Sequence, residues 1–415
     1  TNEQLKEQRK LVAKFTPCRQ LLGNYKTQIA KRSASCVDKS PIDNDDITTE
    51  EKPIEVSQLL KDAASYNPAE DSGWATTAYP EGTPHNVQGK HADRPHINPS
   101  DTSIILFPGQ GNIKVGDVKE YLRFPEAKYL FEIANDSLGY DLLNICLKGP
   151  QEVLDRTEYN QPATVVTALA GLEKLREERP RAIETSIAVA GYSVGEITAL
   201  IFSGAMSFEA GIRLVGVRGA AMQQAAKAVP QGMLAVSYKP EAKISDICQK
   251  AQTWALDVGV PTPECRFAIY LHPDAKILAG SEAALKYVEA NGKKLGIKST
   301  KRLPVSGAFH TGLMAPALEI FRKALRTVDL ELPRVSVHSN IDGKQYRNTQ
   351  QIVRYLPKQI VSPVKWEQTM HILYMRRPGT EFPRTFDVGS KGALKRILKC
   401  VNAKAWNSHM IKIEL

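Results

Sequence analysis

Several common features are missing from this sequence of 415 residues. No apolar run approaches the roughly 20 residues that span a bilayer, so no transmembrane helix is predicted. The six cysteines show neither a CxxC pair nor another metal-ligand spacing, which argues against structural zinc and against a disulfide framework. Heptads and long repeats are also absent. The cysteine usage suits a reducing compartment, and no bound metal or cofactor is expected.

Acidic residues are too few to balance the basic ones, and the imbalance lies in one part of the chain. Residues 1–100 hold 13 Lys and Arg against 14 Asp and Glu, whereas residues 101–415 hold 42 against 31. This distribution favours an anionic ligand or an acidic partner protein. Nucleic acid is not expected, because the sequence contains no zinc finger, RNP signature or basic-aromatic stripe. A basic but merely solvated surface is the alternative.

Residues 1–100 are polar and contain only short apolar clusters, which predicts a mostly disordered segment. The first 40 residues hold nine Lys or Arg against three acids, a bias that is typical of a targeting presequence or its remnant. An ordinary basic tail fits the composition as well. Because the sequence does not begin with Met, we expect the natural chain to start earlier.

The remaining residues predict two subdomains. In residues 101–229 and 306–415, short apolar strands alternate with amphipathic runs, which indicates a large α/β subdomain with a parallel sheet. Residues 230–305 follow the order β-α-β-β-α-β, which is typical of a ferredoxin-like unit. We therefore expect a small subdomain inserted into the larger one, with a ligand in the cleft between them.

The stretch "VAGYSVGEITAL" places Ser193 between two glycines, after an apolar strand and before a helical run. A G-x-S-x-G pentad in this context predicts a sharp strand-to-helix turn that exposes a nucleophilic serine. The helix N-terminus there could stabilise an oxyanion. Alternatively, Gly191 and Gly195 only permit tight packing, and Ser193 is a helix N-cap.

A serine nucleophile needs a base and a second oxyanion donor. Among the eight histidines, His310 is favoured, since it lies in a loop before a helix, directly after the inserted unit. His338 competes, because it lies near the carboxyl end of a predicted strand, where ligands gather in open α/β sheets. "FPGQGN" fits neither a dinucleotide nor a phosphate-loop pattern. Its Gln110 N–H could be the oxyanion donor, or the stretch is only a tight turn.

Arg218 lies on the apolar stripe of a predicted helix, next to Leu214, Val215, Ala221 and Met222. An arginine directed inward is unfavourable unless it is paired. Its partner is either a structural acid of the fold or the carboxylate of a ligand, and the sequence alone favours the structural acid.

Together, five motifs in this order resemble the malonyl-CoA:acyl carrier protein transacylases of the stand-alone mitochondrial type: "FPGQG", "AGYSVGE", "RG" at 218–219, "LPVSGAFHT" and "QIVSPVKWEQTM". The resemblance implies an α/β-hydrolase-like large subdomain with an inserted ferredoxin-like one. It also implies roles for seven residues: Ser193 as nucleophile, His310 as base, the Gln110 and Val194 amides as the oxyanion hole, Arg218 as the clamp for the malonyl carboxylate, the Gln359 carbonyl as the group that orients His310, and Phe309 as a selectivity residue.

The implied reaction transfers malonyl from malonyl-CoA to the phosphopantetheine thiol of an acidic acyl carrier protein, for fatty acid synthesis in the mitochondrial matrix. The main alternative is a serine hydrolase of acyl thioesters, which would need an acidic third member of a triad. A scaffold with a dead site is a third possibility. We expect no cofactor and no metal for the transfer.

Overall fold

The computed structural model describes residues 97–377 and 379–408. These residues belong to one compact unit, Ala92–Leu415. The predicted disorder and targeting role of the N-terminal segment fall almost entirely on residues 1–96, which lie outside the described residues.

The large sheet consists of four parallel strands. They are β1 (Ser103–Phe107), β2 (Ser186–Gly191), β7 (Ser336–His338) and β8 (Arg384–Asp387), in the order β7-β2-β1-β8. Every residue of β1 is buried, as is expected for a parallel sheet with helices on both faces. All four strands were predicted from their short apolar runs. Their carboxyl ends lie at the same edge of the sheet.

Helices account for most of the rest of the large subdomain. The central one, α7 (Thr157–Glu178), is buried over most of its length and packs against α4 (Pro125–Leu138), α9 (Gly195–Phe202) and α10 (Phe208–Ala226). The further α-helices are α5 (Leu142–Lys148), α6 (Gln151–Leu154), α8 (Pro180–Glu184), α13 (Ala315–Leu325), α14 (Thr349–Lys358), α15 (Trp366–Leu373), α16 (Ala393–Val401) and α17 (Ala403–Ser408). Its short 3-10 helices are η2 (Pro99–Asp101), η3 (Asp117–Arg123), η5 (Gly312–Met314) and η6 (Gln359–Val361), whereas η4 (Gly292–Leu295) belongs to the small subdomain.

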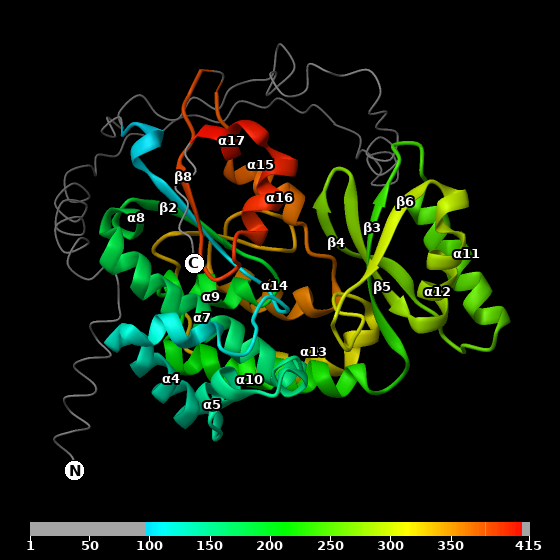
Figure 1. Cartoon of the computed structure of the whole chain (residues 1–415), viewed down its shortest axis with the longest axis horizontal. Helices are drawn as coiled ribbons and strands as arrows, with labels where there is room; N and C mark the ends of the chain where they lie inside the picture. Colours follow the sequence, from blue (N-terminus) through cyan, green and yellow to red (C-terminus); the bar gives the residue numbers. More distant parts are fainter. Residues whose placement is uncertain (1–96, 378, 409–415) are drawn as a thin grey trace, which may run out of the picture. The chain divides into compact units, whose positions relative to one another are not determined.

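The small sheet is antiparallel, with the order β4-β5-β3-β6. Its elements follow the predicted β-α-β-β-α-β order: β3 (Gln231–Tyr238), α11 (Ile244–Asp257), β4 (Cys265–His272), β5 (Ala275–Ser281), α12 (Glu282–Asn291) and β6 (Ile297–Arg302). The two helices lie side by side against one face of this sheet (Figure 1), and share a buried apolar core with it. The predicted fold class is confirmed, whereas the exact subdomain boundaries stay a prediction.

Candidate active site

Ser193 lies on a tight turn between β2 and α9. Its φ of 55° is in the left-handed region, which is strained for a residue with a Cβ. The turn brings the chain so close to itself that a Cβ on Gly191 would lie 1.8 Å from the Gly195 carbonyl oxygen. The pentad therefore needs glycine at these positions because a side chain would clash with the backbone. The turn presents the Ser193 side chain at the carboxyl end of β2.

The imidazole of His310 lies between the serine and a backbone carbonyl. Its Nε2 is 2.8 Å from Ser193 Oγ, and its Nδ1 is 2.7 Å from the carbonyl oxygen of Gln359. A carbonyl can only accept, so Nδ1 carries the proton and Nε2 offers its lone pair to the serine hydroxyl. Like Ser193, His310 has a positive φ, of 64°. The geometry suits removal of the serine proton.

The environment of His310 disfavours its charged form. Burial and the nearby positive charge of Arg218 lower the pKa of His310 to about 3, although the hydrogen bond to Gln359 opposes the shift. The imidazole is therefore neutral at physiological pH, as a general base has to be before it accepts a proton.

Two backbone amides near the serine are free to bind an oxyanion. Neither the N–H of Gln110, which follows β1, nor that of Val194, which follows Ser193, donates a hydrogen bond to any described residue. Unused amides at adjacent turns are what an oxyanion hole requires. The Gln110 side chain is itself held, since its Oε1 accepts from Gln161 at 3.3 Å.

Arg218 reaches Ser193 from α10. One guanidinium nitrogen, Nη2, lies 2.8 Å from Gln359 Oε1 and 3.5 Å from Ser193 Oγ, and Nη1 lies 2.7 Å from Gln161 Oε1. The guanidinium is not solvated in a cleft, because Arg218 is only 1% exposed. The structural acid that the sequence favoured does not pair with it, since no carboxylate of the described residues lies within ion-pair distance.

The other two candidates stand apart from this cluster. His338 ends β7, but its Nδ1 lies 2.7 Å from the carbonyl oxygen of Gly343, and within the described residues it makes no hydrogen bond to Ser193. Burial lowers its pKa. Phe309 is buried beside His310, and its role in acyl selectivity stays a prediction.

Sequence reasoning missed three side chains that hold the site. Asn340 accepts from the Ser193 N–H at 2.7 Å and donates to the Gly191 carbonyl at 2.7 Å, so it fixes the turn. Glu196, fully buried, accepts from Tyr346 and other donors. Gln161, the third, holds Arg218. Asn340 could have been predicted from its position just after β7, at the same strand end as His338.

The carboxyl group of Glu196 is enclosed by donors. Oε1 accepts from the Tyr346 hydroxyl at 2.5 Å, and Oε2 accepts from the Asn340 N–H at 3.2 Å and from Gln359 Nε2 at 2.5 Å. Burial raises the pKa of Glu196 to about 7, although these hydrogen bonds and the charge of Arg218 oppose the shift.

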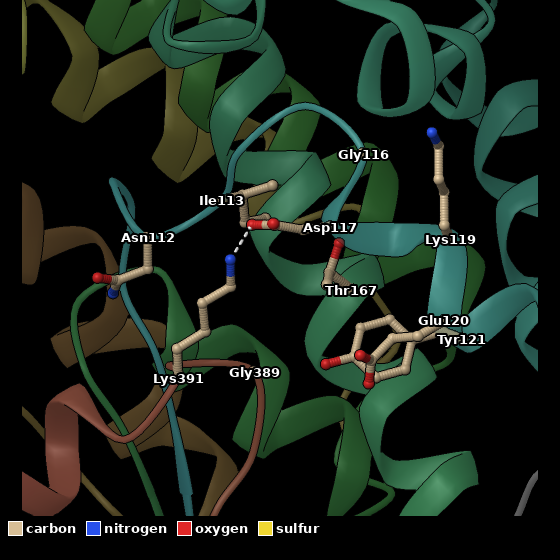
Figure 2. Close-up of a pocket in the computed structure, with 10 residues that line it drawn as sticks. All are labelled: Asn112, Ile113, Gly116, Asp117, Lys119, Glu120, Tyr121, Thr167, Gly389 and Lys391. Atoms are coloured by element: carbon tan, nitrogen blue, oxygen red, sulfur yellow. Dashed lines mark ion pairs between the residues drawn. The ribbon is translucent and has the colours of Figure 1, made fainter. Parts of the chain in front are cut away.

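A cavity of about 340 Å³ is lined by residues 112–121, by Thr167 of α7 and by the loop after β8 (Figure 2). The ion pair of Lys391 with Asp117, at 2.6 Å, spans it. None of the predicted site residues lines this cavity, so it is not part of the site above. Among the described residues, no helix has the length and apolar character of a membrane span, and no cluster of three metal-binding side chains occurs.

Known proteins are similar to most of this chain. Residues 130–380 match the acyl transferase domain family. A Drosophila melanogaster protein named probable malonyl-CoA-acyl carrier protein transacylase, mitochondrial, is 52% identical over 76% of this chain and 83% of its own. The human mitochondrial malonyl-CoA-acyl carrier protein transacylase is 43% identical over 85% and 86%. A malonyl-transacylase solved in complex with a type II PKS acyl-carrier protein has a TM-score of 0.65 at 26% identity, covering 73% of this chain and 94% of that chain.

Proposed function

The chain belongs to the malonyl-CoA:acyl carrier protein transacylases of the stand-alone mitochondrial type, and we propose that Ser193 carries the malonyl group between the two thiols. One observation supports this most directly: Arg218, a buried cation that pairs with no carboxylate of the described residues, lies 3.5 Å from a serine that faces a neutral imidazole. Such a cation suits an acyl group that brings its own carboxylate.

In the first half-reaction, His310 Nε2 takes the proton of Ser193 as Oγ attacks the thioester carbonyl of malonyl-CoA. The Gln110 and Val194 amides stabilise the oxyanion. The carbon–sulfur bond then breaks, and CoA leaves as a thiol with the proton from His310. In the second half-reaction, the phosphopantetheine thiol of an acidic carrier protein gives its proton to His310 and attacks malonyl-Ser193. The ester carbon–oxygen bond then breaks, and Ser193 Oγ takes the proton from His310.

Binding of the malonyl group also makes protonation of His310 less unfavourable. The charge of Arg218 is one cause of the low pKa of His310, so a malonyl carboxylate paired with Arg218 offsets that charge. The imidazolium that forms during acylation is then less unfavourable than in the free enzyme. An acetyl group gives no such compensation, which favours malonyl over acetyl transfer. We also propose that Phe309, buried next to His310 in the chain, excludes a branched acyl group.

The serine hydrolase is the weaker alternative, since His310 Nδ1 donates to a carbonyl where a hydrolase triad has a carboxylate. We place the reaction in the mitochondrial matrix, in support of fatty acid synthesis. The mitochondrial relatives and the nine basic against three acidic residues among the first 40 support this location.

Intact mass spectrometry after mixing with malonyl-CoA tests the proposal. We expect a stable malonyl adduct on the wild type and none on Ser193→Ala. In Arg218→Ala, the free-energy barrier for malonyl transfer should rise by several kcal/mol, roughly 1.5 to 5. The rate of acetyl transfer should be kept. Rapid release of malonate would indicate a hydrolase, the absence of an adduct would indicate a scaffold, and malonyl labelling of Ser193→Ala would contradict the nucleophile assignment.

A further inference from the structure

The side-chain amide of Gln359 connects the parts of the site. Its Oε1 accepts from Arg218 Nη2 at 2.8 Å, while its Nε2 donates to Glu196 Oε2 at 2.5 Å and to the Ser193 carbonyl oxygen at 3.0 Å. The backbone carbonyl of the same residue accepts from His310. Gln359 therefore contacts the nucleophile turn, the base and the guanidinium at once.

The direction of this amide matters for Arg218. An amide has one accepting end and one donating end. If the Gln359 amide were reversed, its oxygen would face the Glu196 carboxylate and the Ser193 carbonyl, and its NH₂ group would face the guanidinium. Gln359 is 1% exposed, so unsatisfied groups at both ends would be strongly unfavourable. The present orientation is the one that gives Arg218 an acceptor.

Glu196 contributes most to this choice, because its Oε2 lies 2.5 Å from Gln359 Nε2, closer than the Ser193 carbonyl oxygen at 3.0 Å. The carboxylate is itself fixed, since it lies in the first turn of α9, directly after the nucleophile turn, and is 0% exposed. Tyr346 holds its Oε1, which leaves Oε2 directed at Gln359. No described ion pair joins Glu196 to Arg218, so its contact with the guanidinium runs through the Gln359 amide.

We propose that Glu196 is a positioning residue for malonyl recognition: its Oε2 fixes the Gln359 amide, whose Oε1 in turn holds the Arg218 guanidinium beside Ser193. This role rests on the proposed function, in which Arg218 binds the malonyl carboxylate. Because acetyl-CoA has no carboxylate for Arg218, loss of the positioning lowers malonyl transfer selectively.

Two substitutions of Glu196 separate the effect of its side-chain length from the effect of its charge. Glu196→Gln keeps the length of the side chain and an oxygen that accepts from Gln359, but removes the charge. Glu196→Asp keeps the charge and withdraws the carboxylate by one methylene. For the ratio of kcat/KM with malonyl-CoA to that with acetyl-CoA, we expect a value within about threefold of wild type in Glu196→Gln. In Glu196→Asp the ratio should fall by about tenfold or more, equivalent to about 1.4 kcal/mol.

Glu173→Asp is the matched control, because it shortens another buried carboxylate, one that pairs with Arg176 and makes no contact with Gln359, and it should keep the ratio within about threefold of wild type. A normal ratio in Glu196→Asp overturns the proposal, and so does an equal loss on both substrates, which would indicate a structural role. A loss in Glu196→Gln with a normal Asp variant would show that charge acts instead. Absence of a malonyl adduct on wild-type Ser193 is a different outcome, which overturns the proposed function itself.

Discussion

The low pKa of His310 has a consequence for stability that is separate from catalysis. Its ordinary value of 6.5 is lowered to about 3 in the folded protein, so between these values the unfolded chain binds a proton that the folded protein does not. The free energy of unfolding therefore decreases as the pH falls through this window. Glu196 acts in the opposite direction, because its raised pKa adds stability below 4.5 that is lost as the pH rises through about 7.

His310→Ala isolates the histidine contribution, because both proteins carry Glu196. As the pH falls from about 6.5 towards 4, the variant should gain stability relative to wild type, by at most about 1.4 kcal/mol per pH unit. Above pH 7.5 the difference should be constant. Denaturant unfolding at a series of pH values measures this, and a difference that is independent of pH throughout would show that His310 titrates normally in the folded protein.

At the scale of elements, the turn from β2 to α9 depends on close backbone approach. A Cβ on Gly191 would lie 1.8 Å from the Gly195 carbonyl oxygen, and one on Gly195 would lie 2.4 Å from the Pro108 carbonyl oxygen. Both neighbours are backbone atoms, which cannot rotate away. The turn that presents Ser193 is thus held from two sides, by β1 with its following loop and by the start of α9.

Gly191→Ala should therefore lower the free energy of unfolding by about 3 kcal/mol or more, and should abolish malonyl labelling of Ser193. Gly259→Ala is the control, because an added Cβ on Gly259 has nothing within 4 Å, and its only strain comes from a positive φ, of 91°. It should lose only about 1 to 2 kcal/mol and keep full labelling. Equal stability losses in the two variants would show that the turn relaxes around the methyl group.

Much of this arrangement could be predicted from local patterns. The strands, the inserted unit and the serine turn each have a residue period or spacing that reflects one element. The hydrogen-bond partners could not be predicted, because Gln161 and Asn340 belong to other elements than the groups they hold. For Arg218, the apolar stripe indicated the inward direction, but only packing against neighbouring helices shows that solvent is excluded.

At the scale of the whole molecule, the parallel sheet brings the site residues together. Gln110 follows β1, Ser193 follows β2 and Asn340 follows β7, so residues far apart in the sequence meet at the carboxyl ends of adjacent strands. His310 and Gln359 reach the same place from outside the sheet. His310 lies just beyond the small subdomain, and a backbone bond from its N–H to the Ile360 carbonyl joins the two segments. The chain therefore returns from the inserted unit at the point where His310 contacts Ser193.

The excess of basic residues predicts that binding of the acyl carrier protein depends on salt. Residues 101–415 hold 42 basic against 31 acidic residues, and such an excess steers an acidic carrier protein by a field that salt screens. Between about 0.1 M and 1 M salt the Debye length falls from about 10 to about 3 Å. Over this range we expect kcat/KM for the carrier to fall by about tenfold or more, whereas transfer to free pantetheine, which is neutral, should change by less than about twofold. Equal decreases for both acceptors would place the salt effect on the enzyme itself, and a carrier kcat/KM that does not depend on salt would refute electrostatic steering.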